Sequence, residues 1–179
     1  MTDELMSEIK VPRTDGSIIT VVGVGGAGGN AVNHMWNLGI RGVTFMVCNT
    51  DQQALDKSPV ERKIRLGSEG LGAGNDPENG RRAAVESLPE IRQVLEEAGT
   101  KMLFITAGMG GGTGTGASPV IAKLAKEMGL LTVAIVTSPL AVEGKIRYEQ
   151  AFRGIEELRQ NTDSLLIINN ENILEIYGR

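Results

Sequence analysis

The stretch Gly108-Met-Gly-Gly-Gly-Thr-Gly-Thr-Gly116 is mostly glycine and stands between two segments of opposite character. Before it lies the apolar run Met102–Ala107. After it, Ala117, Ile121 and Leu124 recur at the spacing of one helix face. A glycine-rich loop between a buried strand and a helix brings backbone N–H groups to a helix N-terminus, where anions bind. The stretch therefore predicts an α/β fold with an anion site at the carboxyl edge of its sheet.

The same alternation of short apolar runs and amphipathic segments extends along the chain. Continuous, largely β-branched runs of four to eight residues are typical of buried parallel strands. The predicted strands are Ile18–Gly23, Val43–Asn49, Lys63–Leu66, Met102–Ala107, Leu131–Thr137 and Ser164–Asn169. This order predicts a Rossmann-like, doubly wound, mostly parallel sheet of about six strands with helices on both faces.

Three amphipathic segments are predicted to form helices whose apolar stripes face the core. They are Asn79–Ala98, the segment from Ala117 to Met128, and the segment that carries Tyr148, Ala151, Phe152, Ile155 and Leu158. Residues 1–16 are polar and end in a turn-forming sequence, so we expect a flexible leader there. Residues 17–179 are expected to form one domain.

Composition excludes several classes of function. Lys and Arg total 18 against 22 Asp and Glu, a net charge of −4, so a nucleic-acid scaffold lacks its electrostatic basis. One cysteine, Cys48, and one histidine, His34, exclude an internal disulfide and a Cys/His zinc cluster. Cys48 lies in an apolar run and is expected to be buried. With neither a membrane-length apolar stretch nor a signal-peptide pattern, we expect a cytoplasmic protein without direct membrane insertion.

Two further glycine-rich loops follow other predicted strands, namely Gly23–Asn30 and Gly70–Gly80. Tight turns alone do not explain three such loops at one sheet edge, since glycine costs backbone entropy. Loops of this kind let backbone N–H groups approach phosphate oxygens. None of the three contains lysine, so backbone dipoles and Mg²⁺ would have to hold the charge of a bound triphosphate.

Two alternatives remain open from the residues alone. Gly23, Gly25 and Gly28 satisfy the G-x-G-x-x-G pattern of an NAD- or flavin-binding oxidoreductase module. Against it, Asn49-Thr-Asp51 follows the second strand where a strand-terminal acid should meet a ribose, and a dinucleotide site needs no second glycine loop. A P-loop is excluded because its G-x-x-x-x-G-K-[ST] pattern does not occur. The second alternative is a nucleotide-regulated interaction domain without catalysis.

A resemblance to a known protein family favours one interpretation of these glycine-rich loops. The loop Gly110-Gly-Gly-Thr-Gly-Thr-Gly116 resembles the signature of the tubulin/FtsZ family of self-assembling GTPases, in its bacterial form. Further matching segments occur in the order and spacing of the family: Gly23–Ala31, Asn49–Leu55, Gly72–Pro77, and Thr137–Gly144 with Arg147. The resemblance runs from about Ile18 to the last residue and implies a GTP-binding domain.

The resemblance also implies a role for individual residues. The first loop would contribute Gly25, Gly26, Ala27, Gly28, Gly29 and Asn30, with Asn30 turned toward the guanine. Asn49 and Asp51 would lie near the phosphates, and Asp51 would reach Mg²⁺ through water. Ala73 and Gly74 would sense the γ-phosphate. The signature loop would cradle the phosphates with Gly111, Gly112, Thr113 and Gly114. Pro139, Glu143 and Arg147 would contact the ribose side of the nucleotide, and Glu143 would accept a hydrogen bond from a ribose hydroxyl. Asn170 would approach the base.

For the whole protein, the resemblance implies GTP or GDP as ligand, Mg²⁺ as cofactor and head-to-tail self-association into protofilaments of a mid-cell division ring. Members of the family continue into a central helix, an acidic loop that completes hydrolysis on the neighbouring subunit's nucleotide, and a second domain. This chain ends at Arg179, so we expect no catalytic residue within it, weak nucleotide binding, little hydrolysis and an ability to cap filaments.

Overall fold

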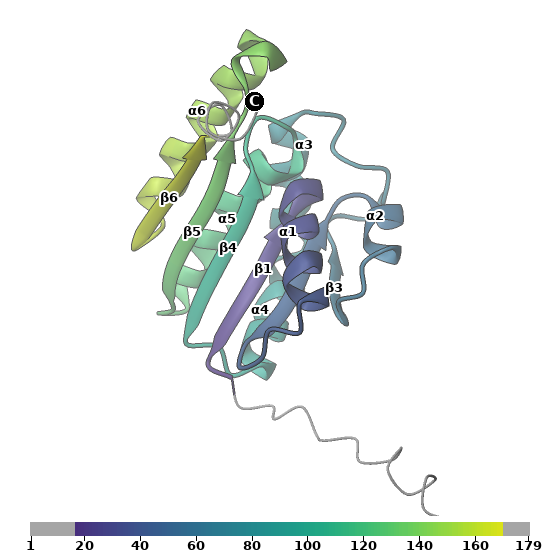
Figure 1. Ribbon diagram of the computed structural model, residues 1–179, viewed down its shortest axis with the longest axis vertical. Helices are drawn as coiled ribbons and strands as arrows, with labels where there is room; N and C mark the ends of the chain where they lie inside the picture. The colour runs from purple at the N-terminus through teal and green to yellow at the C-terminus, as the bar shows by residue number, and fades with distance from the viewer. Residues whose placement is uncertain (1–16, 170–179) are drawn as a thin grey trace, which may run out of the picture.

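The computed structural model describes residues 17–169, which form one six-stranded parallel sheet with helices on both faces (Figure 1). The strand order is β3-β2-β1-β4-β5-β6. The strands are β1 (Ile19–Val24), β2 (Thr44–Asn49), β3 (Arg62–Arg65), β4 (Met102–Gly108), β5 (Leu131–Ser138) and β6 (Ser164–Asn169). All six strand predictions are confirmed to within one residue at each end, as is the predicted fold class.

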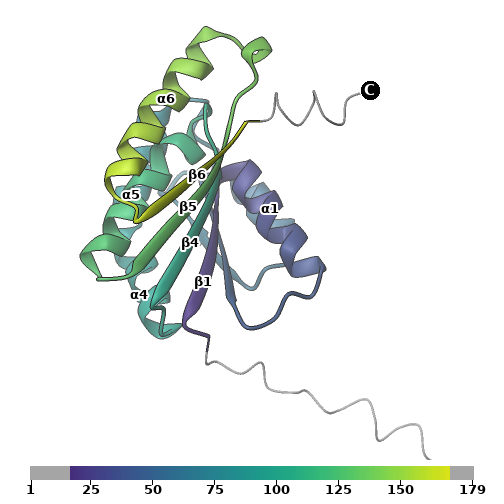
Figure 2. The same ribbon diagram turned by 60° about the vertical axis from the view of Figure 1, so that its left-hand side comes forward.

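Helices lie on both sides of this sheet. Figure 2 shows α1 on one face and α4, α5 and α6 on the other. The helices are α1 (Gly25–Asn37), α2 (Gln52–Asp56), α3 (Pro77–Glu86), α4 (Leu88–Glu97), α5 (Thr113–Glu127) and α6 (Lys145–Gln160), with a 3₁₀ turn η1 (Ala141–Glu143). Because side chains alternate along a strand, neighbouring residues of β1 enter different cores. Val22 packs in the core that contains Ile121 of α5, whereas Val21 packs with Val32 of α1.

The prediction of one helix over Asn79–Ala98 is wrong, because the segment forms two helices. α3 ends at Glu86 and α4 begins at Leu88. Pro89 lies in the first turn of α4, where a missing N–H costs nothing, but within one continuous helix its ring would clash with the preceding turn. Ser87 occupies the break, and its hydroxyl accepts a hydrogen bond from the Gly67 N–H at 3.0 Å.

The apolar stripe predicted for the last helix is only partly correct. Ala151, Ile155 and Leu158 are buried, as expected, but Tyr148 and Phe152 are 56% and 63% exposed. The buried residues share one face of α6 at helical spacing, and this face packs against α5. Tyr148 and Phe152 follow one another at i, i+4 on the neighbouring, outward face. The stripe that reaches the core is therefore narrower than the sequence suggested.

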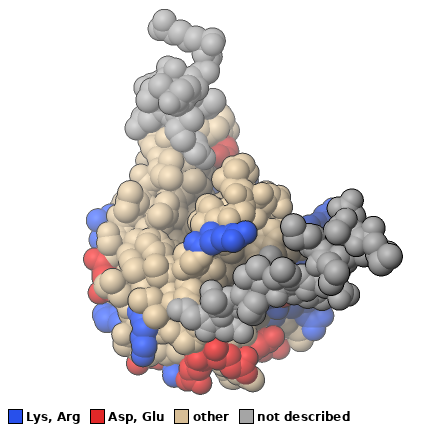
Figure 3. Space-filling view, turned by 60° about the horizontal axis from the view of Figure 1, so that its bottom comes forward, with Lys and Arg blue, Asp and Glu red and all other residues tan. Residues whose placement is uncertain are grey.

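The outer surface carries charges of both signs. In Figure 3, acidic and basic side chains both occur around the face on view, and the basic ones do not gather into a single patch. Within residues 17–169, no helix has the length and apolar character needed to cross a membrane.

Candidate functional site

A cavity of about 580 Å³ opens at the carboxyl ends of the strands. Its lining includes the last residues of four strands: Val24 of β1, Asn49 of β2, Gly108 of β4 and Ser138 of β5. In open α/β sheets this edge is where ligands bind. The cavity is therefore the main candidate site in the described part of the chain.

Two glycine stretches predicted as loops begin helices directly over this cavity. α1 begins at Gly25 and α5 begins at Thr113. Neither helix has a side-chain cap at its N-terminus, and neither carries an acidic residue in its first turn. The first backbone N–H groups of an α-helix have no partner within the helix. The cavity is thus bordered by helix N-termini that can donate to an anion.

The neighbouring helices differ in this respect. Asp51 caps α2, where its Oδ1 accepts from the N–H groups of Gln53 at 2.9 Å and Ala54 at 3.4 Å. Asp76 caps α3 and accepts from the Glu78 N–H at 2.9 Å. Aspartate caps are the common solution for a helix that needs no ligand. At α1 and α5, in contrast to α2 and α3, no side chain occupies the helix end that faces the cavity.

Most of the residues named by the sequence come together in this one cavity. They are Gly26, Ala27, Asn49, Asp51, Ala73, Gly74, Gly111, Gly112, Thr113, Gly114, Pro139, Glu143 and Arg147. These residues come from five separate parts of the chain. The structure therefore brings these residues together around one cavity, and their part in nucleotide binding stays a prediction.

The remaining predicted residues lie elsewhere. Gly25, Gly29 and Asn30 line a smaller cavity of about 220 Å³ that borders α1 and α2. Gly28 lines neither cavity, because its Cα packs directly against the carbonyl oxygen of Thr106, where a Cβ would overlap it. Asn170 lies outside the described residues.

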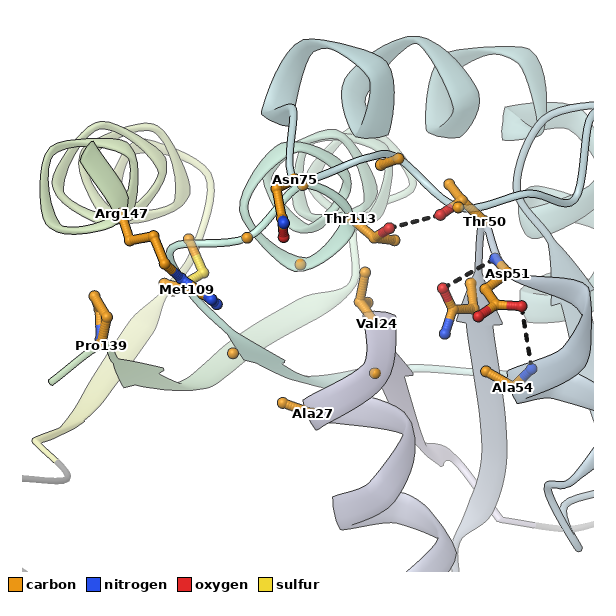
Figure 4. A pocket seen from close by; sticks show the side chains of 18 of the residues that line it. Val24, Ala27, Thr50, Asp51, Ala54, Asn75, Met109, Thr113, Pro139 and Arg147 are labelled. Atoms are coloured by element: carbon orange, nitrogen blue, oxygen red, sulfur yellow. Dashed lines mark hydrogen bonds between the residues drawn. The ribbon is translucent and has the colours of Figure 1, made fainter. Parts of the chain in front are cut away.

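Several lining residues were missed at the sequence level. Thr50, Asn75, Met109, Thr137 and Ser138 all border the cavity. The Oγ1 atoms of Thr50 and Thr113 lie 2.7 Å apart and form a hydrogen bond in its wall (Figure 4). A usable signal existed for Thr50 and Asn75, since each stands immediately beside residues already named. The sequence carries no such signal for Met109, because an apolar residue next to a strand is expected to pack in the core.

The glycine-rich loop before α5 is fixed by side chains of the helix that follows it. The Gly110 N–H donates to Thr115 Oγ1 at 2.7 Å, and Ser118 Oγ donates to the Gly114 carbonyl at 2.6 Å. Thr115 and Ser118 are buried. Gly110 has φ +112°, a conformation that residues with a side chain rarely adopt. The loop is therefore held in one shape without contact to any ligand.

Charged side chains in the cavity are few. Glu143 Oε1 accepts from the Leu140 N–H at 2.8 Å, and its Oε2 lies 3.3 Å from Arg147 Nε. Arg147 is the single basic residue, and no lysine occurs, among the described residues of the lining. Within residues 17–169, no three His, Cys, Asp or Glu side chains come together as a metal-binding group. Most of the positive potential in the cavity therefore comes from backbone dipoles.

The predicted burial of Cys48 is confirmed. The residue is fully buried under the sheet edge, and desolvation raises the pKa of its thiol, with a smaller contribution from Glu90. A thiol that stays protonated is neither a nucleophile nor a metal ligand. Cys48 is therefore a packing residue.

This fold and cavity define an α/β domain that presents glycine-rich helix N-termini to an anionic ligand without a P-loop lysine. The chain belongs to the Tubulin/FtsZ family, since the sequence model of that family's GTPase domain matches residues 18–178. The oxidoreductase alternative is accordingly set aside.

Individual relatives agree with this assignment. The chain is 52% identical to the cell division protein FtsZ of Porphyromonas gingivalis over 180 residues, which cover 99% of this chain and 39% of the relative. It is 52% identical to the Pseudomonas aeruginosa cell division protein FtsZ over 166 residues, which cover 91% of the chain and 42% of the relative. The chain thus spans about two fifths of the length of these curated relatives.

Solved structures show the same fold. An empty FtsZ dimer from M. jannaschii superposes with a TM-score of 0.86 at 46% identity and covers 90% of this chain and 47% of that one. CetZ2 from Haloferax volcanii, solved as a GTPγS-bound protofilament, superposes with a TM-score of 0.77 at 28% identity. That match covers 86% of this chain and 49% of CetZ2.

Proposed function

We propose that the chain binds GTP and GDP in the 580 Å³ cavity, as the nucleotide domain of a filament-forming GTPase of the bacterial division ring. The observation that carries the proposal is the pair of uncapped helix N-termini, α1 and α5, at the edge of the cavity. Helix N-termini of this kind bind phosphate through backbone N–H groups and the helix dipole.

Within this proposal, the phosphates lie against Gly111–Gly114 and the start of α5. The ribose lies toward Pro139, Glu143 and Arg147, at the end of β5. The guanine lies beside α1, near Ala27, and contacts Asn30. Asn30 lines the smaller neighbouring cavity together with Gly26, which borders both cavities. A base-side contact from Asn30 therefore requires the nucleotide to reach across the first turn of α1.

Mg²⁺ fits this cavity as an ion shared with the nucleotide. Asp51 and Glu143 are the acidic residues of its described lining, and Glu143 is paired with Arg147. Asp51 uses Oδ1 as a helix cap, and its second oxygen is directed at neither capped N–H. Mg²⁺ commonly takes one or two carboxylates plus phosphate oxygens and water. Asp51 would hold the ion, which would neutralise developing charge on the phosphates.

Hydrolysis requires a water molecule aligned with the terminal phosphate. The residues of this cavity bind and orient the nucleotide, and backbone N–H groups stabilise negative charge in the transition state. Of its two carboxylates, Asp51 caps α2 and would hold Mg²⁺, and Glu143 pairs with Arg147. Alignment of the water is therefore assigned to acidic residues of a neighbouring subunit, and hydrolysis depends on assembly.

The same division of the site implies how subunits of the complete protein would associate. The complete protein would associate head to tail, so that one subunit closes the nucleotide site of the next, in the cytoplasm at mid-cell. The 179-residue chain presents the nucleotide face. It would accept a neighbour at that face and thereby cap growing filaments of a full-length relative.

Titration calorimetry with GTP, GDP, ATP and NAD in parallel tests the proposal. We expect binding of GTP and GDP, weaker binding of ATP and none of NAD. GTP turnover by the chain should be slow at every protein concentration. Preference for NAD, or turnover at the rate of assembled full-length relatives, would refute the proposal.

Light scattering of an assembling full-length relative should fall when the chain is added, and an unchanged signal would contradict capping.

A further inference from the structure

Helix α6 touches the glycine-rich loop before α5, and the first turn of α5, at two places along one face. Near the start of α6, the Arg147 carbonyl oxygen lies 3.2 Å from the Cβ position of Gly110. Two turns later, Gly154 lies against Met109 and Thr115. Residues seven apart share one face of an α-helix, so both contacts belong to the same side of α6. α6 therefore rests on the loop and on α5 at both points.

The contact at Gly154 leaves no room for a side chain. A Cβ there would lie 2.6 Å from Thr115 Cγ2, 2.8 Å from Met109 Cε and 3.1 Å from the Thr115 carbonyl oxygen. Carbon atoms that are not bonded normally stay about 3.5–4.0 Å apart. Alanine at this position would therefore push one side of the contact away by about 1 Å.

The α5 side of this contact is held firmly. Thr115 is buried, and its Oγ1 accepts from the Gly110 N–H at 2.7 Å. Behind it, α5 packs so closely on α3 that a Cβ on Gly116 would overlap the Pro77 carbonyl oxygen. α6, in contrast, lies at the edge of the molecule (Figure 2), and residues 145–149 at its start are exposed. A side chain added at this contact would therefore displace α6 and not α5.

A displaced α6 would carry Arg147 with it. Arg147 Nη2 lies 3.9 Å from the Cβ position of Gly111, and Arg147 is the one basic residue of the described cavity lining. Figure 4 shows its side chain extending from α6 toward Met109. Its ion-pair partner Glu143 belongs to the 3₁₀ turn that leads into α6, so this pair does not anchor α6 to another part of the fold. The packing of α6 on the loop therefore determines where the guanidinium lies.

We infer that Gly154 is a positioning residue for Arg147: its missing side chain lets α6 lie close enough to the glycine-rich loop to hold the guanidinium beside a bound nucleotide. This inference rests on the proposed function. Gly154 is not among the described residues that line the cavity, so it acts through Arg147. A charge-assisted hydrogen bond depends on distance and direction, so a shift of about 1 Å weakens it.

The test measures GDP binding by titration calorimetry for Gly154→Ala, Arg147→Ala and the double variant, at a temperature where urea unfolding shows each to be folded. Alanine favours a helix over glycine, which offsets part of the strain in Gly154→Ala. This variant should bind GDP about three- to tenfold more weakly and, like Arg147→Ala, depend less on salt. Without the Arg147 side chain, Gly154→Ala should change the affinity by less than about twofold.

Two further variants separate this role from general destabilisation. Ile155→Val shortens a neighbouring buried side chain of α6 without adding bulk, so it should bind GDP as the unaltered chain does. Thr115→Ser removes Cγ2, the atom nearest the added Cβ, and keeps the hydroxyl that accepts from the Gly110 N–H. Gly154→Ala/Thr115→Ser should therefore regain most of the affinity that Gly154→Ala loses, measured against Thr115→Ser alone.

A loss of affinity in Gly154→Ala that vanishes in the Arg147→Ala background, and that Thr115→Ser recovers, supports the inference. An unchanged affinity, or an equal loss with and without the Arg147 side chain, would overturn it while the proposed function stands. A loss that Thr115→Ser does not recover would also overturn it, because the close contact would then not be the cause. Failure of the unaltered chain to bind GDP would refute the proposed function and the inference with it.

Discussion

The side-chain oxygens of Thr50 and Thr113 lie 2.7 Å apart and join the residue that follows β2 to the first residue of α5. Thr50 is buried, and both residues line the cavity proposed for the nucleotide. It links two segments that are 63 residues apart in the sequence. The pair therefore stabilises the shape of the site before any ligand binds.

Thr50→Val is expected to lower the free energy of unfolding by about 1 kcal/mol, because the Thr113 hydroxyl loses its partner in a partly buried position. The double variant Thr50→Val/Thr113→Val should lose little more, since both hydroxyls are then gone. Urea unfolding without nucleotide measures both effects. Thr44→Val, at the start of β2 and outside the cavity lining, is the control. Additive losses in the double variant would show that the two hydroxyls act independently.

Gly28 and Gly29 are adjacent in α1, yet alanine should affect them in opposite directions. A Cβ on Gly28 would overlap the Thr106 carbonyl, whereas a Cβ on Gly29 would meet nothing within 4 Å. We expect Gly28→Ala to lower the unfolding free energy by at least about 1–3 kcal/mol. Gly29→Ala should raise it by up to about 1 kcal/mol, because alanine favours a helix. Thermal unfolding without nucleotide measures both, and equal effects would contradict this packing.

Arg147 is expected to contribute most of the side-chain attraction between the cavity and a nucleotide. It is the basic residue of the described lining, and its guanidinium lies near Gly111. Arg147→Ala should weaken GTP binding by about tenfold or more and reduce its dependence on salt, since one charge contact is lost. Arg147→Lys should recover only part of this, because lysine cannot reproduce the planar fork of donors.

The control for this prediction is Arg153→Ala. Arg153 lies on the same helix, α6, in an exposed position outside the cavity. The substitution Arg153→Ala removes the same charge as Arg147→Ala and should leave GTP affinity nearly unchanged. Similar losses in both variants would indicate a general effect of net charge on binding.

The strands could be predicted from the sequence because parallel strands buried on both faces need unbroken apolar runs. Ile19–Val24 and Thr44–Asn49 are such runs, and all but the first residue of each is buried. The division between α3 and α4 was missed because the apolar stripe continues across Ser87. Pro89 was the available signal, since proline fits the first turn of a helix but not its interior.

The walls of the cavity could be predicted because each glycine stretch has its own sequence pattern. The separate roles of the glycines could not. Gly28 allows close packing against Thr106, whereas a Cβ on Gly29 would meet no atom within 4 Å. Nothing in a run of glycines distinguishes the two positions. The positive φ of Asn75, +58°, could not be predicted either, because the loop that carries it is held by distant residues: Gly72 N–H donates to the Thr50 carbonyl, and Ala73 and Asp76 pack on Gly112.

Stability of the chain at high pH should depend on Cys48. Burial, and to a lesser degree Glu90, raises the pKa of its thiol in the folded state. The unfolded thiol ionises near its ordinary pKa of about 8.5. Below that pH both states hold the proton and Cys48 adds no pH dependence. Above it only the unfolded state releases the proton, so the free energy of unfolding falls by up to about 1.4 kcal/mol per pH unit.

Cys48→Ala isolates this effect from the titration of other groups. The variant should be less stable than the unaltered chain at pH 7, because a buried side chain has been shortened. Its stability should then decline less steeply between about pH 8.5 and 10.5, so that the two curves converge. Urea unfolding at a series of pH values measures both slopes. Parallel curves would mean that the thiol ionises equally in both states, which is incompatible with a fully buried Cys48.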